Sequence, residues 1–120
     1  MAWRTESTFV FDEWVASLAR PEQDAIVAAI EHLERDGPGL GRPLVDTIKG
    51  SRHRNMKELR PLGGHIRILF AFDPRRSALL LLGGDKTNRW QSWYREMIPI
   101  ADRLYDDHLE RIRNSEREGR

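Results

Sequence analysis

The segment that decides the fold, residues 55–84, reads NMKELRPLGGHIRILFAFDPRRSALLLLGG. Three runs within it, 55–62, 66–73 and 77–84, are short, rich in strand-favouring residues and bounded by turn residues. The connections between them are too short to hold a crossover helix. We therefore predict an antiparallel three-stranded meander. We assign both glycine pairs, GG at 63–64 and at 83–84, to hairpin turns.

Side-chain alternation along the middle run assigns its residues to two faces. Ile66, Ile68 and Phe70 share one face, and Arg67 lies on the other. Arg67 would share its face with one of two sets from the preceding strand, either Lys57 with Leu59 or Glu58 with Arg60. The third run is apolar at every position from 78 to 82, which indicates a strand covered on both faces.

Helical patterns flank this sheet. The apolar run 8–11 is interpreted as a first strand, and Asp12 can cap a helix that follows it. A second helix begins at Arg20-Pro21 and ends near Asp36, before Gly-Pro-Gly, so that the two helices form an antiparallel hairpin. The last third repeats apolar residues at helical spacing, and Pro99 predicts a break into a short and a longer helix. The predicted fold is α+β: an N-terminal strand and helical hairpin packed on an antiparallel meander, with a C-terminal helix.

Composition indicates one globular domain. The chain has 120 residues, of which 39% are hydrophobic and 32% are charged with mixed sign. We assign residues 1–113 to the domain and the polar residues 114–120 to a tail that frays. The apolar runs are too short to span a membrane, no secretory signal is visible at the N-terminus, and cysteine is absent. We therefore expect a reducing, cytoplasmic setting and no membrane partner.

The formal net charge of +1 hides an uneven distribution of charge. Residues 1–41 carry −5, residues 42–89 carry +7 and residues 90–120 carry −1. Such a block predicts either a face that binds an anionic partner, usually nucleic acid, or a set of solvated strand and loop residues. The candidates for contacting phosphate groups of such a partner are Arg52, Arg54, Lys57, Arg89 and Trp93.

Other kinds of site lack their sequence signatures. The four histidines fall in four predicted elements without metal-ligand spacing, and we expect no metal site. Neither glycine pair belongs to a phosphate-binding loop. The aromatic residues Trp90, Trp93 and Tyr94 could stack on bases, although a stripe at helical spacing is more typical of a core. Trp93 is one step off that stripe, so it is the better candidate for an exposed ring.

Four motifs follow one another along the chain: KELR at 57–60, IRILF at 66–70 after a glycine turn, GGDKT at 83–87 and IPIADRLY at 98–105. Their order and spacing resemble the RelE/ParE toxin superfamily, and most of all its phage-derived, HigB-like branch. The resemblance extends over residues 9–109. It agrees with the element order inferred independently from periodicity and turn residues.

The resemblance implies a type II toxin, an endoribonuclease that needs no metal or cofactor and cuts mRNA on the ribosome. It also implies a cognate helix-turn-helix antitoxin that neutralises the enzyme in a hetero-oligomeric complex. In such enzymes the ribose 2′-hydroxyl attacks the adjacent phosphorus, so side chains must transfer protons and stabilise charge on phosphoryl oxygens. Arg67 matches the family's strand arginine, Arg60 the arginine of its ELR motif, and Lys86 the first lysine of its lysine motif. Tyr94 and His65 are further candidates, for proton transfer or base stacking.

The chain departs from the family pattern at two places. Met56 and Glu58 stand where some members carry lysines, and Thr87 stands where the motif has a second lysine. The acid and the base are therefore not identified. Cross-strand ion pairs offer a structural role for the same side chains, Glu58, Arg60 and Arg67. Two other classes stay open: a ParE-like toxin that inhibits a topoisomerase without nuclease activity, and a degenerate module that binds only its antitoxin or nucleic acid.

Overall fold

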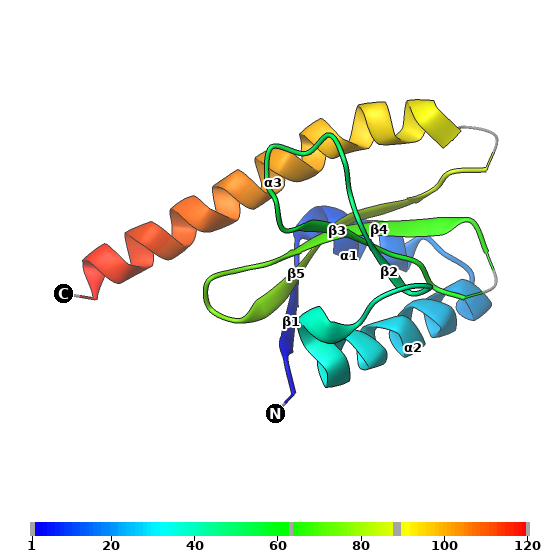
Figure 1. Cartoon of the computed structure of the whole chain (residues 1–120), viewed down its shortest axis with the longest axis horizontal. Coiled ribbons are helices and arrows are strands. Elements are labelled where there is room, and N and C mark those ends of the chain that lie inside the picture. Colours follow the sequence, from blue (N-terminus) through cyan, green and yellow to red (C-terminus); the bar gives the residue numbers. More distant parts are fainter. Residues whose placement is uncertain (1, 63, 88–89, 120) are drawn as a thin grey trace.

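The computed structural model describes residues 2–62, 64–87 and 90–119. Its elements are β1 (Arg4–Ser7), α1 (Phe9–Ala16), α2 (Arg20–Asp36), the 3-10 turn η1 (Gly37–Gly39), β2 (Val45–Thr47), β3 (Met56–Leu59), β4 (Ile66–Phe72), β5 (Ser77–Asp85) and α3 (Trp90–Glu118). The strands form one mixed sheet in the order β1-β5-β4-β3-β2. Helices α1 and α2 pack on one face of this sheet, and α3 crosses the other face (Figure 1). The predicted α+β fold is confirmed.

The predicted meander is present as the antiparallel strands β3, β4 and β5. Two strands extend it: β2 pairs antiparallel with β3, and β1 pairs in parallel with β5. The prediction of a first strand at residues 8–11 is wrong, because Thr8 caps α1. Its Oγ1 accepts a hydrogen bond from the Phe11 N–H at 3.0 Å, so Thr8 and not Asp12 is the capping residue.

Alternation along β4 sorts its residues as predicted. Ile66, Ile68 and Phe70 belong to the core beneath α1 and α2, whereas Leu69 belongs to the core beneath α3. Residues 78–82 of β5 are buried and contribute to both cores. The sheet is therefore covered on both faces at its centre.

Gly83 and Gly84 lie inside β5 and not in a turn, which corrects the prediction for this pair. A Cβ on Gly83 would overlap the indole of Trp14, and a Cβ on Gly84 would overlap the indole of Trp93. The two glycines therefore let one tryptophan close on each face of the sheet. Gly63 of the other pair lies outside the described residues.

The predicted break at Pro99 is wrong, because α3 is one helix of 29 residues. Figure 1 shows its ribbon continuous and bent. Proline removes a backbone hydrogen bond from a helix interior, but Ile98 and Ala101 anchor the helix in the core on both sides of it. The helix continues through the exposed residues 114–118, and the division into a domain and a fraying tail stays a prediction. Within the described ranges, no helix is both long enough and apolar enough to cross a bilayer.

Candidate functional site

Charged side chains on three neighbouring strands, or directly after them, gather around one carboxylate on the α3 face of the sheet. Glu58 Oε1 lies 3.1 Å from Arg67 Nε, and Glu58 Oε2 lies 3.5 Å from a terminal nitrogen of Arg60. The Tyr94 hydroxyl of α3 donates a hydrogen bond to Glu58 Oε1. The Lys86 Nζ lies 5.6 Å from the centre of the Tyr94 ring. We call these five residues the Glu58 cluster.

Strand register explains how these side chains meet. Glu58 pairs with Leu69 across β3 and β4, and Arg67 pairs with Gly84 across β4 and β5. Leu69 and Arg67 are two residues apart on β4 and so lie on the same face of the sheet. Of the two sets that could have shared a face with Arg67, it is therefore Glu58 with Arg60 that does so. Lys86 follows the last residue of β5. Its amide donates a hydrogen bond to the His65 carbonyl at 3.2 Å, which holds the backbone next to the start of β4.

The cluster is closed off from solvent to different degrees. The exposed fraction of the side chain is 3% for Glu58, 14% for Arg67 and 33% for Arg60, so Arg60 is the most accessible of these three. Lys86 is buried. With its Nζ against the Tyr94 ring of α3, the charge is costly unless it is compensated.

Two guanidinium N–H groups in the cluster have spare hydrogen-bonding capacity. The Nε atoms of Arg60 and Arg67 are buried and have no hydrogen-bond partner among the described residues. Arg67 Nε lies within ion-pair distance of the Glu58 carboxylate, but its N–H is not directed at that carboxylate and makes no hydrogen bond with it. The Nη1 atom of Arg67 donates to the Ile66 carbonyl at 2.8 Å, which fixes the plane of the guanidinium. Buried donors without an acceptor are uncommon and need an explanation.

The environment shifts the two titrating neighbours of Glu58 in different ways. Burial lowers the pKa of Lys86, and the positive charge of Arg67 lowers it further. Burial, followed by the hydrogen bond to Glu58, raises the pKa of Tyr94. Tyr94 therefore keeps its proton at neutral pH, whereas Lys86 holds its proton less tightly than an exposed lysine does.

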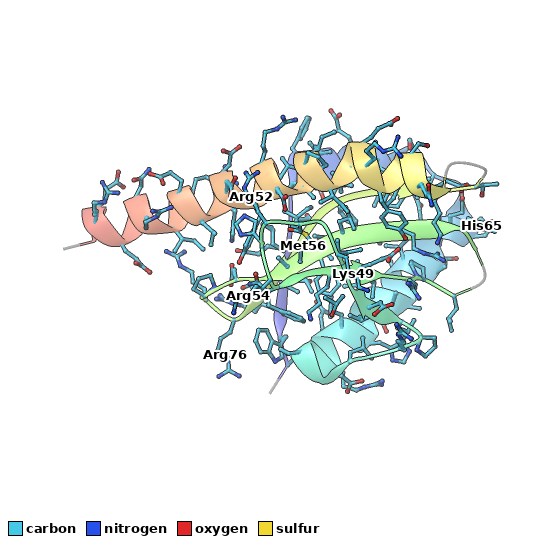
Figure 2. The ribbon with its side chains drawn as sticks, turned by 45° about the horizontal axis from the view of Figure 1, so that its top comes forward. Lys49, Arg52, Arg54, Met56, His65 and Arg76 are labelled. Atoms are coloured by element: carbon cyan, nitrogen blue, oxygen red, sulfur yellow. The ribbon has the colours of Figure 1, made fainter. Side chains whose placement is uncertain are left out.

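Two predicted residues of the basic block lie away from the cluster. The His65 side chain is exposed at the start of β4 and lines a pocket with Glu22 and Asp85 (Figure 2). Lys57 alternates with Glu58 on β3, so its side chain lies on the opposite face of the sheet, where Nζ donates to Thr47 Oγ1 at 3.2 Å.

The loop before β3 carries two more of the predicted RNA contacts. Arg52 pairs with Asp106 of α3, whose other carboxylate oxygen lies 2.7 Å from His53 Nε2. Arg54 is exposed, and Figure 2 shows it toward the end of the molecule that carries Arg76, whereas His65 lies at the other end. Arg89 lies outside the described residues.

The preference for Trp93 as the exposed aromatic residue is wrong. Only 2% of this residue is accessible, because its indole fills the space above Gly84. Its ring also packs edge-on against Tyr94, with 5.0 Å between the ring centres. Helical periodicity could not predict this contact. The space for the indole exists because Gly84, which belongs to β5 and not to the helix, has no side chain.

Glu58 is the member of the cluster that sequence reasoning undervalued. By sequence it is a departure from the family pattern and an ion-pair candidate, whereas the structure places it at the centre of the cluster. The signal was the alternation E-x-R at residues 58 and 60, on a strand next to the one that carries Arg67. A second group, Glu6, Asp73 and His108, brings its ligand-type atoms within 4.8 Å of one another from distant positions that no spacing rule connects.

The fold is shared with solved structures of RelE proteins. It resembles a chain in the RelBE2 toxin–antitoxin complex of Mycobacterium tuberculosis, with a TM-score of 0.55 and 15% identity over 71% of this chain and 99% of that chain. It also resembles a chain in the archaeal RelE–RelB complex of Pyrococcus horikoshii, with a TM-score of 0.57 and 15% identity over 72% of this chain and 97% of that chain. At this identity the likeness shows a RelE-like fold.

The model of the family described as phage derived protein Gp49-like (DUF891) matches residues 13–106, and the chain belongs to that family. HigB2 and HigB3 of Mycobacterium tuberculosis, each named as a candidate toxin, are both 52% identical to it, over 99 and 98 residues. The matches cover 80% and 82% of this chain. They cover 49% of HigB2 and 86% of HigB3, so the chain spans about half the length of HigB2. The resemblance to the HigB-like branch is confirmed.

Proposed function

We propose that this protein is the toxin of a type II toxin–antitoxin system, an endoribonuclease that cuts mRNA on the ribosome and so inhibits translation. Family membership and the 52% identity to HigB2 and HigB3 support the toxin assignment. The likeness to chains found in RelE–RelB complexes supports a cognate antitoxin as partner, which we expect to be a helix-turn-helix protein in a hetero-oligomer. The nuclease assignment depends on the Glu58 cluster.

The observation that carries the nuclease proposal is the pair of buried guanidinium N–H groups without an acceptor, on Arg60 and Arg67. A phosphoryl oxygen is an acceptor that would satisfy them, because arginine keeps its charge and donates along fixed directions. Charge that develops on the phosphoryl oxygens in the transition state would strengthen these hydrogen bonds. Arg67, held on backbone carbonyls and beside Glu58, is the better positioned of the two.

In the proposed reaction the ribose 2′-oxygen attacks the adjacent phosphorus and the bond from phosphorus to the 5′-oxygen breaks. The products are a 2′,3′-cyclic phosphate and a 5′-hydroxyl. The Glu58 carboxylate takes the proton from the 2′-hydroxyl, and Lys86, whose pKa is lowered, gives a proton to the leaving 5′-oxygen. Tyr94, whose pKa is raised, keeps its proton and positions Glu58.

Access to the cluster requires movement in this scheme. Glu58 and Lys86 are buried, and Tyr94 of α3 contacts Glu58 directly. Substrate would enter from the side of Arg60, the more exposed of the two arginines of the cluster, while the N-terminal part of α3 moves off the sheet. Lids that close over a catalytic group in this way are common in enzymes.

The same burial favours a second function. In this second case the role of Glu58 is purely structural: its carboxylate, which already pairs with two arginines, joins the strands to α3. The protein would then act by binding, either as a ParE-like topoisomerase inhibitor without nuclease activity or as a degenerate module for antitoxin or nucleic acid. His65, which is exposed and away from the cluster, has no part in the proposed chemistry.

Primer extension on translated mRNA, after induction of the wild-type protein in cells, tests the proposal. We expect cuts inside translated codons, and a cutting rate lower by roughly 10²–10³ for Arg67→Ala, as when one oxyanion donor is removed. Arg67→Lys should restore part of the rate, because a point charge cannot reproduce the two-pronged contact. Arg20→Ala, at an exposed arginine of α2, is the matched control, and circular dichroism checks that each variant folds.

The outcomes separate the candidate functions. A folded Arg67→Ala variant that cuts mRNA like the wild type contradicts the role of Arg67. Growth arrest with double-strand DNA breaks and intact mRNA supports the topoisomerase inhibitor. Arrest that is lost together with the fold assigns Arg67 to the structural role.

A further inference from the structure

Four exposed arginines surround the turn between β4 and β5, at the far end of these strands from the Glu58 cluster. They are Arg4 of β1, Arg75 and Arg76 of the turn, and Arg111 of α3. We call them the arginine surface. Arg75 lines two adjoining pockets, one with Arg111 and one with Arg4 and Arg76, so the four side chains form one surface.

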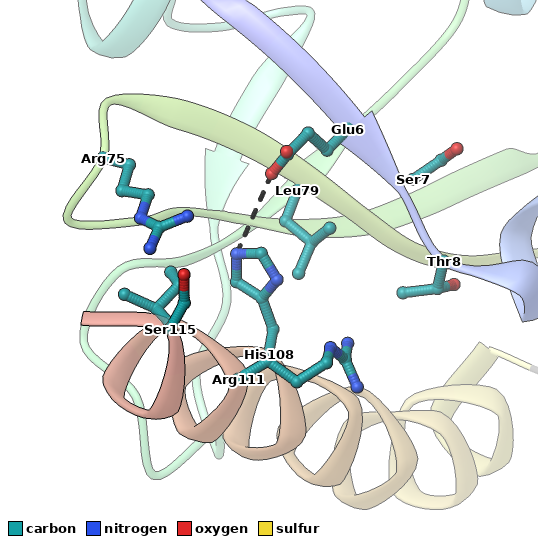
Figure 3. A pocket seen from close by; sticks show the side chains of 9 residues that line it. Glu6, Ser7, Thr8, Arg75, Leu79, His108, Arg111 and Ser115 are labelled. Carbon is teal, nitrogen blue, oxygen red and sulfur yellow. Dashed lines mark ion pairs between the residues drawn. The ribbon is translucent and has the colours of Figure 1, made fainter. Parts of the chain in front are cut away.

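The larger of these pockets lies between α3 and strands β1 and β5. It has a volume of about 380 Å³, and Figure 3 shows the guanidinium of Arg75 directed toward His108 and Glu6. Its polar lining consists of the arginines, His108, Glu6 and three residues with hydroxyl groups, Ser7, Thr8 and Ser115. Cationic and hydroxyl donors therefore outnumber the single carboxylate at its wall.

The arginines of this surface are free to meet a ligand. Across residues 2–62, 64–87 and 90–119, none of the four takes part in an ion pair, unlike Arg52, Arg60 and Arg67. The guanidinium of Arg76 lies 5.1 Å from the centre of the Trp3 ring, which orients it without neutralising it. Arg76 also has a φ of 64°, a conformation that glycine would adopt more easily, so the turn geometry does not account for an arginine here.

A metal ion is the competing occupant of the larger pocket. Glu6, Asp73 and His108 could in principle supply three ligand atoms. However, Asp73 Oδ1 accepts hydrogen bonds from the amides of Arg75 and Ser77 at 2.9 Å, and Oδ2 lies 2.8 Å from His108 Nε2. Oδ1 is thus engaged in holding the turn, and Oδ2 is engaged with His108 of α3. Two guanidinium groups in the same pocket repel a cation, so the chemistry favours an anion.

We propose that the arginine surface binds the phosphate groups of an RNA strand, separately from the Glu58 cluster. The inference rests on the proposed function, in which RNA is the substrate. Arginine side chains meet phosphate oxygens with paired N–H groups, and hydroxyl groups commonly add contacts to phosphate. The seven residues of β4 span about 20 Å, so one strand that touches both regions would be several nucleotides long.

Fluorescence anisotropy with a labelled single-stranded RNA tests the inference on the full chain. The RNA carries 2′-O-methyl groups, which leave its phosphates unchanged and prevent cleavage. For Arg75→Gln/Arg111→Gln we expect a dissociation constant roughly ten times higher, and a salt dependence lower by about 1.4 in slope, since each phosphate contact contributes about 0.7. Arg20→Gln/Arg35→Gln removes the same charge from α2, on the opposite face of the sheet, and should bind like the wild type.

Glu6→Gln gives a result of opposite sign. It removes the carboxylate from the pocket, so RNA should bind more tightly. If the pocket holds a metal, the same variant lowers Zn²⁺ affinity in a calorimetric titration and leaves RNA binding unchanged, which overturns the inference.

Two further results decide against the arginine surface. Wild-type protein that binds no RNA overturns the inference, and so does an Arg75/Arg111 variant that binds RNA as the α2 control does. Primer extension keeps the two proposals apart. If the wild-type protein cuts mRNA but its RNA binding does not depend on the arginine surface, only the nuclease proposal is supported. If RNA binding depends on the arginine surface but the protein does not cut mRNA, only the proposal of the arginine surface is supported.

Discussion

The two ends of strands β4 and β5 carry arginines in opposite states. At the Glu58 cluster, Arg60 is partly buried, Arg67 is largely buried, and the two share one carboxylate. At the arginine surface, the side chains are exposed and form no ion pair within the part of the chain that the structure describes. Most of these arginines belong to the same +7 block of the sequence. A single net charge for a segment can therefore combine arginines that are buried and ion-paired with arginines that are exposed and form no ion pair.

The difference follows from what covers each end. Over the cluster, Trp93 and Tyr94 of α3 lie directly on the strands, because Gly84 leaves room for an indole. At the other end, α3 contacts the turn through His108 and its last residues extend beyond the sheet (Figure 1), which leaves the arginines around the turn exposed. Charges under a covering helix act over short distances and need partners. Exposed charges act through solvent and attract an anion from further away.

The largest expected effect is a loss of stability on removing the charge of Glu58 at the buried end. Glu58→Gln leaves Arg60, Arg67 and Lys86 beneath α3 without the carboxylate that Arg60 and Arg67 share, and we expect the free energy of unfolding to fall by about 3 kcal/mol. Glu6→Gln makes the same chemical change at the exposed end and should alter it by less than about 0.5 kcal/mol. Urea denaturation followed by circular dichroism measures both. Equal losses would contradict the distinction between the two ends.

A smaller effect concerns the closure of α3 over the cluster. In Gly84→Ala the new methyl group overlaps the buried indole of Trp93, and overpacking of this kind costs about 1–3 kcal/mol of stability. Gly39→Ala is the matched control, because a Cβ there meets no atom within 4 Å. Thermal unfolding and tryptophan fluorescence report the two changes. A Gly84→Ala protein as stable as the control would show that Trp93 is not seated on this glycine.

The smallest effect concerns an arginine of the intermediate kind, paired but exposed. Arg52, and after it His53, holds the pKa of Asp106 below its usual value of 3.8. A carboxylate with a lowered pKa in the folded protein stabilises it fully above pH 3.8, and this contribution is lost as the pH falls through the lowered pKa. Asp106→Asn should therefore be slightly less stable than wild type near pH 6, and the difference should close on acidification below pH 3.8. A difference that is independent of pH would contradict the ion pair.

Local patterns predicted the elements that depend on near neighbours. The meander, the two faces of β4 and the covered β5 follow from alternation and turn residues over a few positions. The three-residue strand β2 and the true position of β1 were missed. A strand that short carries no period, and β1 is defined by its pairing with β5, more than seventy residues away along the chain. Pro99 was misjudged because packing outweighed its local cost.

By itself, the sequence determined the fold class, the face of β4 on which Arg67 lies, and the family of the chain, since each of these is written in spacing and residue type. Only the tertiary structure decided that Glu58 sits at the centre of the cluster and that Trp93 is buried. It also separated neutralised arginines from free ones, and joined Arg4 and Arg111 to the turn. The physical reason is that burial and charge pairing depend on contacts between segments far apart in the chain, which become defined only when the sheet and α3 pack together.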